Sequence, residues 1–259
     1  MPYCLIKIGY DSSFHGVQYQ PGIRTVMGEI NKITSRMGIR KVYFSSRTDS
    51  FVRSSTNLIE AEFGNCMALA SAINSINGIY VLSYASVDEY VPLRGRFVKE
   101  YLYFSTSIPE TDALAETISE FMKSDYSKFS KDKGKKVYLD KIDFYILNFG
   151  TILSFKGKAF SWNFVRISSE CILKRALGEI NKEEWDKVIE GEVNCKYKGK
   201  GENLILYKSI LPFDMINFPS DKLDELEFEL IKQLIWIRGM DSRIINKISQ
   251  IADVFFDKK

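Results

Sequence analysis

The sequence predicts an α+β fold made of two units whose sheets join. The length of 259 residues suits two fused units of roughly 100–150 residues each. Strand-like and helix-like stretches alternate in both halves, without a close sequence repeat. The 45% hydrophobic and 27% charged residues are the balance of a globular protein with a sizeable core. We therefore expect an N-terminal unit over residues 1–106 and a C-terminal unit over residues 107–259.

Hydrophobic periodicity locates the elements of the N-terminal unit. Apolar residues alternate from Leu5 to Tyr10, as they do in a half-buried strand. Apolar residues at positions 26, 30, 33 and 37 follow one another at spacings of three and four, which predicts a helix over about 25–37. Further strands are expected over 42–44, 58–63, 79–86 and 97–105, and a second helix over 67–76.

The C-terminal unit shows a similar order of elements. Pro109 precedes a helical stretch over 110–122, the position that helix geometry favours for proline. Asn148-Phe149-Gly150 separates two strand-like runs, 142–147 and 151–155, which predicts a hairpin. Helices are expected over 162–177, 182–189 and, broken near Gly239, 221–256, with a short strand over 204–207. The lysine-rich stretches 127–136 and 196–201 are expected to be loops.

Charge and cysteine content restrict the class of protein. A net charge of +3 and a pI of about 8.5 do not by themselves indicate a nucleic-acid binder, although a basic groove on such a body is possible. No two of the four cysteines have the C-x-x-C spacing, so we expect reduced, buried thiols. The N-terminus lacks the layout of a signal peptide, and no apolar run reaches the roughly 18 residues of a membrane span. We therefore expect a cytoplasmic protein.

The single histidine excludes much chemistry. His15 cannot form a two-histidine metal site, and any Ser-His or Cys-His pair would have to use it. Catalysis would then depend on carboxylates, lysines, tyrosines or arginines. We therefore expect no metal.

The stretch Ser46-Arg47-Thr48-Asp49 is the first candidate for chemistry. A guanidinium near a carboxylate lowers the carboxylate pKa and keeps it charged, as a carboxylate nucleophile requires. The alternative is a turn aspartate beside a solvated arginine, and this is the more common case for such a tetrapeptide. The tetrapeptide alone does not decide between these alternatives.

Seven short stretches carry a family resemblance. They read Y-D-S-S-F-H-G-V-Q-Y-Q at residues 10–20, R-T-V at 24–26, S-R-T-D at 46–49, K-E-Y-L-Y at 99–103, S-D-Y-S-K-F at 124–129, A-F-S-W-N-F-V-R at 159–166 and N-L-I-L at 203–206. In the same order they resemble Y-D-G-x-x-F-x-G-W-Q-x-Q, R-(S/T)-V, G-R-T-D, (K/R)-x-Y-x-Y, H-D-F-S-x-F, A-F-L-x-x-M-V-R and G-L-x-L, which are motifs of the TruA family of tRNA pseudouridine synthases. The shared order over residues 3–211 makes the resemblance specific.

The chain departs from the family pattern around the aspartate. Ser46 stands where the family has glycine, and residues 50–54 read S-F-V-R-S where A-G-V-H-A is usual. Arg53 therefore stands where a histidine is common. Arg47 and Asp49 themselves are kept, so the departures bear more on the RNA target than on the reaction.

The resemblance implies a fold and a reaction. The implied fold is the pseudouridine synthase fold, with two ferredoxin-like α+β halves sharing an extended mixed, largely antiparallel sheet with a central cleft. The reaction breaks the glycosidic bond of uridine, turns the base and rejoins it through C5, without a cofactor. Asp49 would be the catalytic carboxylate, and Arg166 would lie against it across the cleft. A helix-surface position is the alternative for Arg166.

The resemblance also implies the residues that hold RNA. Arg47 would contact the RNA and help to extrude the target nucleotide, which must leave the stem to react. Tyr101 would stack on the flipped base, although a buried core tyrosine is a serious alternative. Tyr103 shares its strand face and is expected in the core. Leu204, with Leu206, could form the apolar wall of the pocket, or simply pack in the core.

Basic stretches suggest how a large substrate could be held. The candidates for phosphate contacts are Lys131, Lys133, Lys135, Lys136, Lys196, Lys198 and Lys200, with Arg94, Arg96 and Lys99 as a stripe beside the cleft. Solvated loops are the usual explanation for lysine runs. The resemblance implies tRNA as the substrate, modified in the anticodon stem-loop at positions 38, 39 and/or 40, and a homodimer as the binding form.

Two other functions remain open at this level. A catalytically inactive RNA-binding relative of the same fold would account for the altered residues after Asp49. A carboxylate-dependent hydrolase acting on a nucleoside or glycan would need a second catalytic carboxylate, and it would release free base or sugar.

Overall fold

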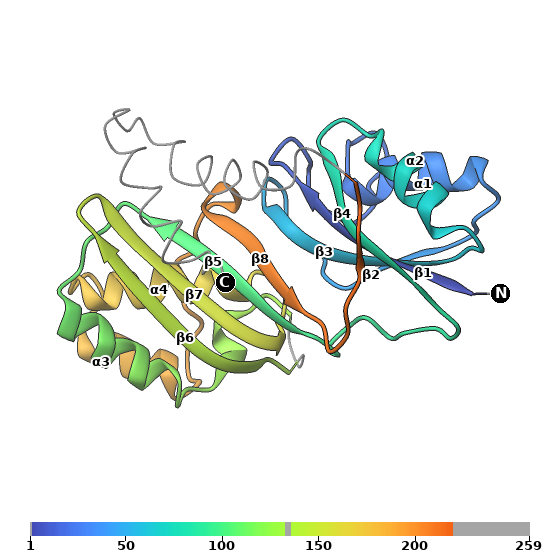
Figure 1. The fold of residues 1–259 in the computed structure, drawn as a ribbon. Helices are drawn as coiled ribbons and strands as arrows, with labels where there is room; N and C mark the ends of the chain where they lie inside the picture. Colours follow the sequence, from blue (N-terminus) through green and yellow to red (C-terminus); the bar gives the residue numbers. More distant parts are fainter. Residues whose placement is uncertain (1, 133–135, 220–259) are drawn as a thin grey trace.

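The computed structural model describes residues 2–132 and 136–219, and one continuous sheet runs through this part of the chain (Figure 1). Its strands are β1 (Tyr3–Tyr10), β2 (Val42–Phe44), β3 (Arg53–Glu62), β4 (Ile79–Val87), β5 (Val98–Ser105), β6 (Tyr138–Leu147), β7 (Gly150–Ala159), β8 (Leu204–Ile210) and β9 (Ile216–Asn217). The helices are α1 (Val26–Arg36), α2 (Cys66–Asn74), α3 (Thr111–Phe121), α4 (Phe164–Ala176) and α5 (Lys182–Ile189), with 3-10 turns η1 (Tyr126–Phe129) and η2 (Gly201–Asn203).

The strand order shows how the two halves join. The sheet runs β6-β7-β5-β8-β3-β1-β4-β9, and β2 pairs with β3. Among the described strands, β3 and β8 are the parallel pair, and all other pairs are antiparallel. Arg53 lies opposite Ile205 in this central pair. The predicted α+β class, with an extended mixed and largely antiparallel sheet, is confirmed.

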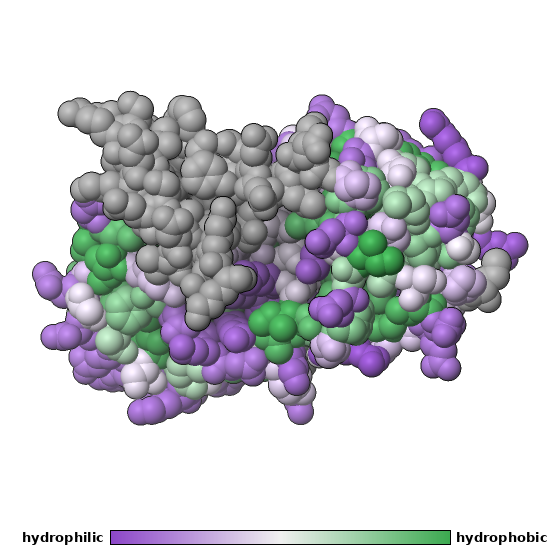
Figure 2. All heavy atoms as spheres, in the orientation of Figure 1, coloured by the Kyte–Doolittle hydropathy of each residue, from purple (hydrophilic) through white to green (hydrophobic). Residues whose placement is uncertain are grey.

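The core of the first half lies on both faces of β1. Cys4, Ile6 and Ile8 belong to the cluster that α1 and α2 cover, whereas Leu5 packs on the opposite face with Leu58. This alternation follows from the two-residue period of a strand. α1 begins after Thr25, whose hydroxyl accepts a hydrogen bond from the backbone N–H of residue 28 at 3.1 Å. On the face drawn in Figure 2, hydrophilic residues surround smaller apolar patches over both halves.

The second core joins α3, α4 and α5 to the other end of the sheet. Phe121, Phe164 and Trp185 are buried there against β7 and β5. Tyr101 and Tyr103 of β5 belong to this same cluster, although they precede residue 107. The division of the chain between residues 106 and 107 stays a prediction.

Several element boundaries differ from the sequence expectation. β6 begins at residue 138 rather than 142, because an edge strand with exposed polar residues has no clear hydrophobic alternation. α4 begins at Phe164 rather than at residue 162, because Asn163 adopts a left-handed conformation with φ 61°. The expected helices over 221–256 lie outside the described residues. Within the described ranges, no helix is long and apolar enough to cross a membrane.

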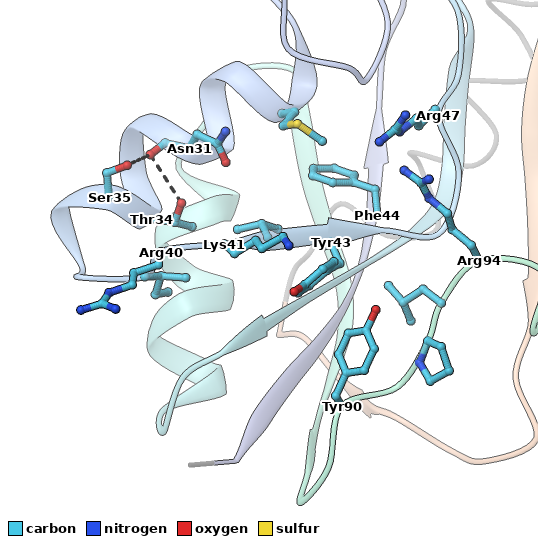
Figure 3. Close-up of a pocket in the computed structure, with 15 residues that line it drawn as sticks. Asn31, Thr34, Ser35, Arg40, Lys41, Tyr43, Phe44, Arg47, Tyr90 and Arg94 are labelled. Carbon is cyan, nitrogen blue, oxygen red and sulfur yellow. Dashed lines mark hydrogen bonds between the residues drawn. The ribbon is translucent and has the colours of Figure 1, made fainter.

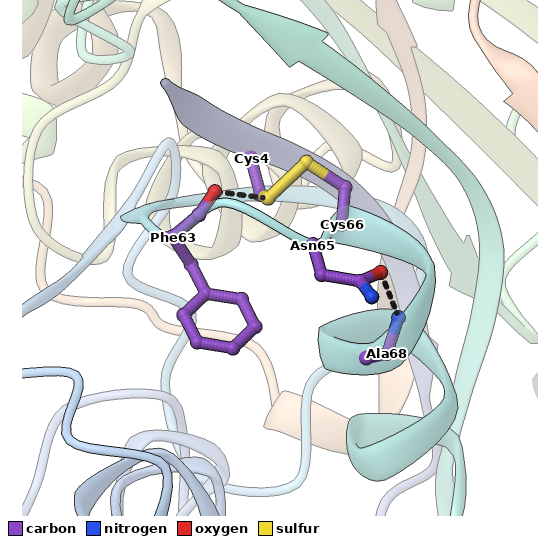
Figure 4. The surroundings of a disulfide bond; sticks show 5 residues. All are labelled: Cys4, Phe63, Asn65, Cys66 and Ala68. Atoms are coloured by element: carbon purple, nitrogen blue, oxygen red, sulfur yellow. Dashed lines mark hydrogen bonds between the residues drawn. A yellow bond between two sulfur atoms is a disulfide. The ribbon is translucent and has the colours of Figure 1, made fainter. Parts of the chain in front are cut away.

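The prediction of reduced thiols was wrong for this structure. Cys4 is bonded to Cys66 and Cys171 to Cys195, with Cα atoms 5.2 and 6.6 Å apart. Figure 4 shows Cys4 on β1 directly beside Cys66 at the start of α2. The partners are 62 and 24 residues apart in the sequence, so their proximity arises from the packing of helices against neighbouring segments and not from a local motif.

Candidate active site

Asp49 and Arg166 form an ion pair between the two halves. Asp49 lies on the loop between β2 and β3, and its Oδ2 atom is 2.9 Å from Nη1 of Arg166 near the start of α4. The two side chains are 19% and 13% exposed, respectively. The contact expected between these residues is therefore present, in a partly buried setting where a charge-assisted hydrogen bond is strong.

Three acceptors fix the guanidinium of Arg166. Besides Asp49, its Nε donates to the carbonyl oxygen of Gly199 at 2.7 Å, and its Nη1 donates to Oδ1 of Asn163 at 3.2 Å. Asn163 precedes α4 and makes no side-chain capping bond, so its amide serves the arginine instead. A Cβ atom at Gly199 would lie 2.0 Å from the hydroxyl of Tyr103, so only glycine fits there. Sequence reasoning missed Asn163, because it occupies a variable position of its motif.

Trp162 holds the second oxygen of the carboxylate. Its indole Nε1 donates to Oδ1 of Asp49 at 3.0 Å, although 54% of the residue is exposed. The amino group of Lys131 lies 5.7 Å from the centre of the Trp162 ring. Sequence reasoning missed Trp162, because the resembling motif leaves its position open. Both carboxylate oxygens of Asp49 are thus held by side chains of the C-terminal half.

Buried polar groups fix the loop that carries Asp49. Oδ1 of Asn57 on β3 accepts from the hydroxyl of Ser45 at 2.9 Å and from the backbone N–H of Ser46 at 3.2 Å. Nδ2 of Asn57 donates to the carbonyl of Ser46 at 2.9 Å. The hydroxyl groups of Tyr10 and Thr48 are 2.9 Å apart. Burial raises the pKa of Tyr10 to about 12, so this phenol stays protonated and can act as a donor.

Two backbone positions accommodate this loop, Gly16 on the neighbouring segment before α1 and Phe51 on the loop itself. Gly16 has φ +86°, and a Cβ atom there would lie 2.8 Å from the carbonyl oxygen of Thr48. Phe51 has φ 66°, which is unusual for a residue with a side chain. The loop therefore bends without the glycine that the resembling motif has at the position of Ser46.

Arg53 is buried at the junction of the halves. Its Nη1 donates to the carbonyl of Glu202 at 2.9 Å and its Nη2 to the hydroxyl of Ser12 at 3.3 Å. Burial lowers the pKa of its guanidinium. Arg53 thus connects the start of β3 to η2, a structural role that the sequence did not indicate.

Tyr101 lies close to Asp49 and is nearly buried. It is 8% exposed and pairs with Leu206 across β5 and β8. Burial is the main cause that raises the pKa of Tyr101, and the charge of Asp49 adds to it. Leu204 pairs with Tyr103 instead, and both leucines are buried in the second core. Tyr103 is fully buried as expected, and its hydroxyl donates to Glu170.

Arg47 lies at the surface of the molecule. It is exposed, and its Nη1 donates to Oε1 of Gln18 at 3.4 Å. The expected basic stripe is only partly present, because Lys99 is buried and donates to the carbonyl of Ser45 at 2.7 Å, whereas Arg94 and Arg96 are exposed.

Lys198, in one of the lysine-rich loops, lies near Asp49. Burial lowers the pKa of Lys198, and the neighbouring charges of Arg166 and Lys131 lower it further. Lys196 instead pairs with Glu184 at 2.7 Å. Lys136 and Lys200 are exposed, whereas Lys133 and Lys135 lie outside the described residues. In residues 2–132 and 136–219, no group of three His, Cys, Asp or Glu side chains could hold a metal ion.

Comparison with known proteins identifies the class and then the family. No family model matches the chain. Curated archaeal relatives named tRNA pseudouridine synthase A match most of it. The protein of Pyrococcus abyssi is 30% identical over 226 residues, 82% of this chain and 85% of the relative. That of Pyrococcus horikoshii is 29% identical over 83% of this chain and 86% of the relative, and that of Methanopyrus kandleri is 25% identical over 84% and 88%.

A solved structure gives a more distant likeness. The archaeal box H/ACA sRNP Nop10-Cbf5 complex aligns with 93% of this chain and 58% of its own chain, at a TM-score of 0.39 and 12% identity. The α+β fold and the curated relatives define an isomerase of the pseudouridine synthase class. The chain belongs to the tRNA pseudouridine synthase A (TruA) family.

Proposed function

We propose that this enzyme isomerises uridine to pseudouridine in the anticodon stem-loop of tRNA, at positions 38, 39 and/or 40, with Asp49 as its catalytic carboxylate. The observation that supports the proposal most is the Asp49–Arg166 ion pair at 2.9 Å. The Asp49 side chain is largely buried, with 19% of it exposed, where the two halves of the sheet meet. The altered residues after Asp49 leave this pair intact.

The chemistry needs a fixed, charged carboxylate. The C1′–N1 bond breaks, a C1′–C5 bond forms, C5 loses a proton and N1 gains one, so no water or oxidant is consumed. Loss of the base gives C1′ oxocarbenium character, which a nearby carboxylate stabilises or captures. Arg166, Trp162 and Asn163 would hold the carboxylate in place while the base turns.

The remaining site residues would hold the RNA. The target uridine must flip out of the stem at a cost of a few kcal/mol. Tyr101 would meet the flipped base at the carboxylate, with Leu204 in the apolar wall behind it. Arg47, exposed on the same loop as Asp49, would contact the strand that the uridine leaves. A homodimer acting on tRNA in the cytoplasm, without a cofactor, completes the proposal.

Substitution of Asp49 tests the function directly. Asp49→Ala and Asp49→Asn should abolish pseudouridine formation in a tRNA transcript while RNA binding is largely kept. Asp88→Asn is the matched control, because Asp88 is exposed and far along the chain from the loop. Turnover by Asp49→Ala would disprove the role of this residue. Wild-type enzyme that binds tRNA without converting it would indicate an inactive relative, and release of free uracil would indicate a hydrolase.

A further inference from the structure

A second cavity lies beside the loop of Asp49, on the N-terminal half. It has a volume of about 640 Å³ and lies between α1, the segment 39–47 and the segment 90–94 (Figure 3). Arg47 lines one end of it, two residues before Asp49 in the chain. The cavity therefore adjoins the candidate active site without containing the catalytic carboxylate.

The charged residues that line this cavity are all positive. Arg40, Lys41, Arg47 and Arg94 line it, and its described lining residues include no aspartate or glutamate. Figure 3 shows the guanidinium groups of Arg47 and Arg94 directed toward one another. Burial lowers the pKa of Arg94, and the charge of Arg47 lowers it further. Two like charges that face each other repel, and an anion placed between them would relieve that repulsion.

Two aromatic rings form the wall next to these cations. The ring centres of Tyr43 and Tyr90 are 5.1 Å apart, with an interplanar angle of 59°. Nζ of Lys41 lies 4.7 Å from the centre of the Tyr43 ring, so that ring already has a cationic neighbour. Tyr90 also contacts Tyr3 edge-on, with ring centres 6.0 Å apart, and 45% of the residue is exposed. Exposed aromatic rings beside arginines are the usual means of binding unpaired RNA bases.

We infer that this cavity is a second RNA subsite, in which Tyr90 stacks on an unpaired base and Arg47 and Arg94 bind its phosphate. The inference rests on the proposed function, because the ligand is a nucleotide of the same RNA whose uridine reaches Asp49. Arg47 and Asp49 share one loop, so the two sites would hold two positions on one RNA molecule. The second subsite would fix where along the strand the target uridine falls.

Variants of the cavity test this inference. Arg94→Ala and Tyr90→Ala should each raise the Kd for a tRNA transcript about tenfold, as expected for one lost phosphate contact or one lost stacked base. Arg36→Ala is the matched control, since Arg36 is an exposed arginine of α1 outside the cavity lining. It should change the Kd less than about twofold, and thermal melting should show all three variants folded. The single-turnover rate at saturating RNA should be unchanged in Arg36→Ala.

Photo-cross-linking supplies an independent readout. Transcripts that carry 4-thiouridine in place of uridine should form an adduct on the peptide that contains Tyr90, and Arg94→Ala should reduce its yield about tenfold. Equal RNA affinity of Arg94→Ala and Arg36→Ala would overturn the inference. Weaker binding by Arg94→Ala with no effect of Tyr90→Ala would also overturn it, because the cavity would then bind a phosphate and not a nucleotide. Neither result depends on Asp49, whose substitution tests the proposed function separately.

Discussion

The two sides of the Asp49 loop use arginine in opposite ways. On the side of the C-terminal half, Arg166 is largely buried and its guanidinium donates to Asp49, Asn163 and Gly199. On the other side, Arg47 is exposed, makes one long hydrogen bond to Gln18 and faces Arg94. An arginine whose donors are used within the protein fixes a catalytic group. An arginine that faces another cation can bind an anion, and the described residues that line this cavity supply none.

This contrast explains the position of Asp49 in the sheet. The central parallel pair β3–β8 brings the loop before β3 beside α4, which the C-terminal half contributes. Arg53 strengthens this junction through Glu202 and Ser12. The carboxylate is thus held where the two halves meet, while the cationic cavity belongs to the N-terminal half alone.

Arg166 should give the largest effect. Arg166→Ala is expected to lower kcat by about 10²-fold or more, because a catalytic group displaced by even about 1 Å loses that much. Arg166→Lys should recover little of this loss, since a lysine keeps the charge but cannot reach three acceptors in fork geometry. Steady-state assays over a range of RNA concentrations measure kcat and KM, and Arg36→Ala, an exposed arginine of α1, is the control. If Arg166→Ala raised KM alone, Arg166 would bind substrate and the contrast would fail.

Trp162 should give the second effect. Trp162→Phe keeps the aromatic ring and removes the 3.0 Å hydrogen bond to Asp49. We expect kcat to fall about tenfold, in line with one lost hydrogen bond to a charged group. Trp185→Phe is the matched control. It removes a 2.7 Å indole hydrogen bond to Glu120, which lies outside the candidate site. That control should lower the melting temperature and leave kcat unchanged, whereas an unchanged kcat in Trp162→Phe would remove Trp162 from the positioning of Asp49.

The sequence predicted this site unevenly. Asp49 and Arg166 could be paired in advance because each lies in a motif of its own, 117 residues apart. The roles of Trp162 and Asn163 could not be predicted. They depend on the left-handed conformation of Asn163 just before α4, where both side chains contact the ion pair. Periodicity indicates which face of an element is buried, but it carries no information on such turns.

The fold class was easier to predict from the sequence than the disulfide bonds. The alternation of strands and helices predicted the α+β class, because burial of one face leaves a regular pattern in each element. The pairing of Cys4 with Cys66 left no such pattern, since it depends on where α2 begins relative to β1. The contact between Arg47 and Gln18 was equally hidden, because no pattern in the sequence connects these two loop residues.

Arg47 should affect binding and not stability. Arg47→Ala removes an exposed side chain with one weak partner, so the free energy of unfolding should change by no more than about 0.5 kcal/mol. The Kd for tRNA should rise about tenfold, and the salt dependence of binding should weaken by about one released counterion. Titrations of tRNA at several salt concentrations provide both values. A loss of kcat as large as that of Arg166→Ala, at unchanged Kd, would make the two arginines equivalent.

Lys99 should give the smallest effect, a rise of the unfolding free energy with pH. This lysine lies on the Arg47 side of the loop, near Arg94. Burial and the nearby charge of Arg94 lower the pKa of Lys99 from 10.5 to about 8. Between these two values the unfolded chain binds more protons than the folded one, so this group makes stability rise with pH in that window. Relative to Lys99→Met, the wild type should gain on the order of 1 kcal/mol of unfolding free energy between about pH 7 and pH 9.

Urea denaturation of both proteins at the two pH values measures this gain. Arg94→Ala should reduce it, because one source of the lowered pKa is then removed. Since the backbone carbonyl of Ser45 accepts from Lys99 at every pH below the pKa, that hydrogen bond cannot produce the same trend. If wild type and Lys99→Met gained stability equally, burial and Arg94 would not lower the pKa of Lys99, and the Arg47 side of the loop would not disfavour this further positive charge.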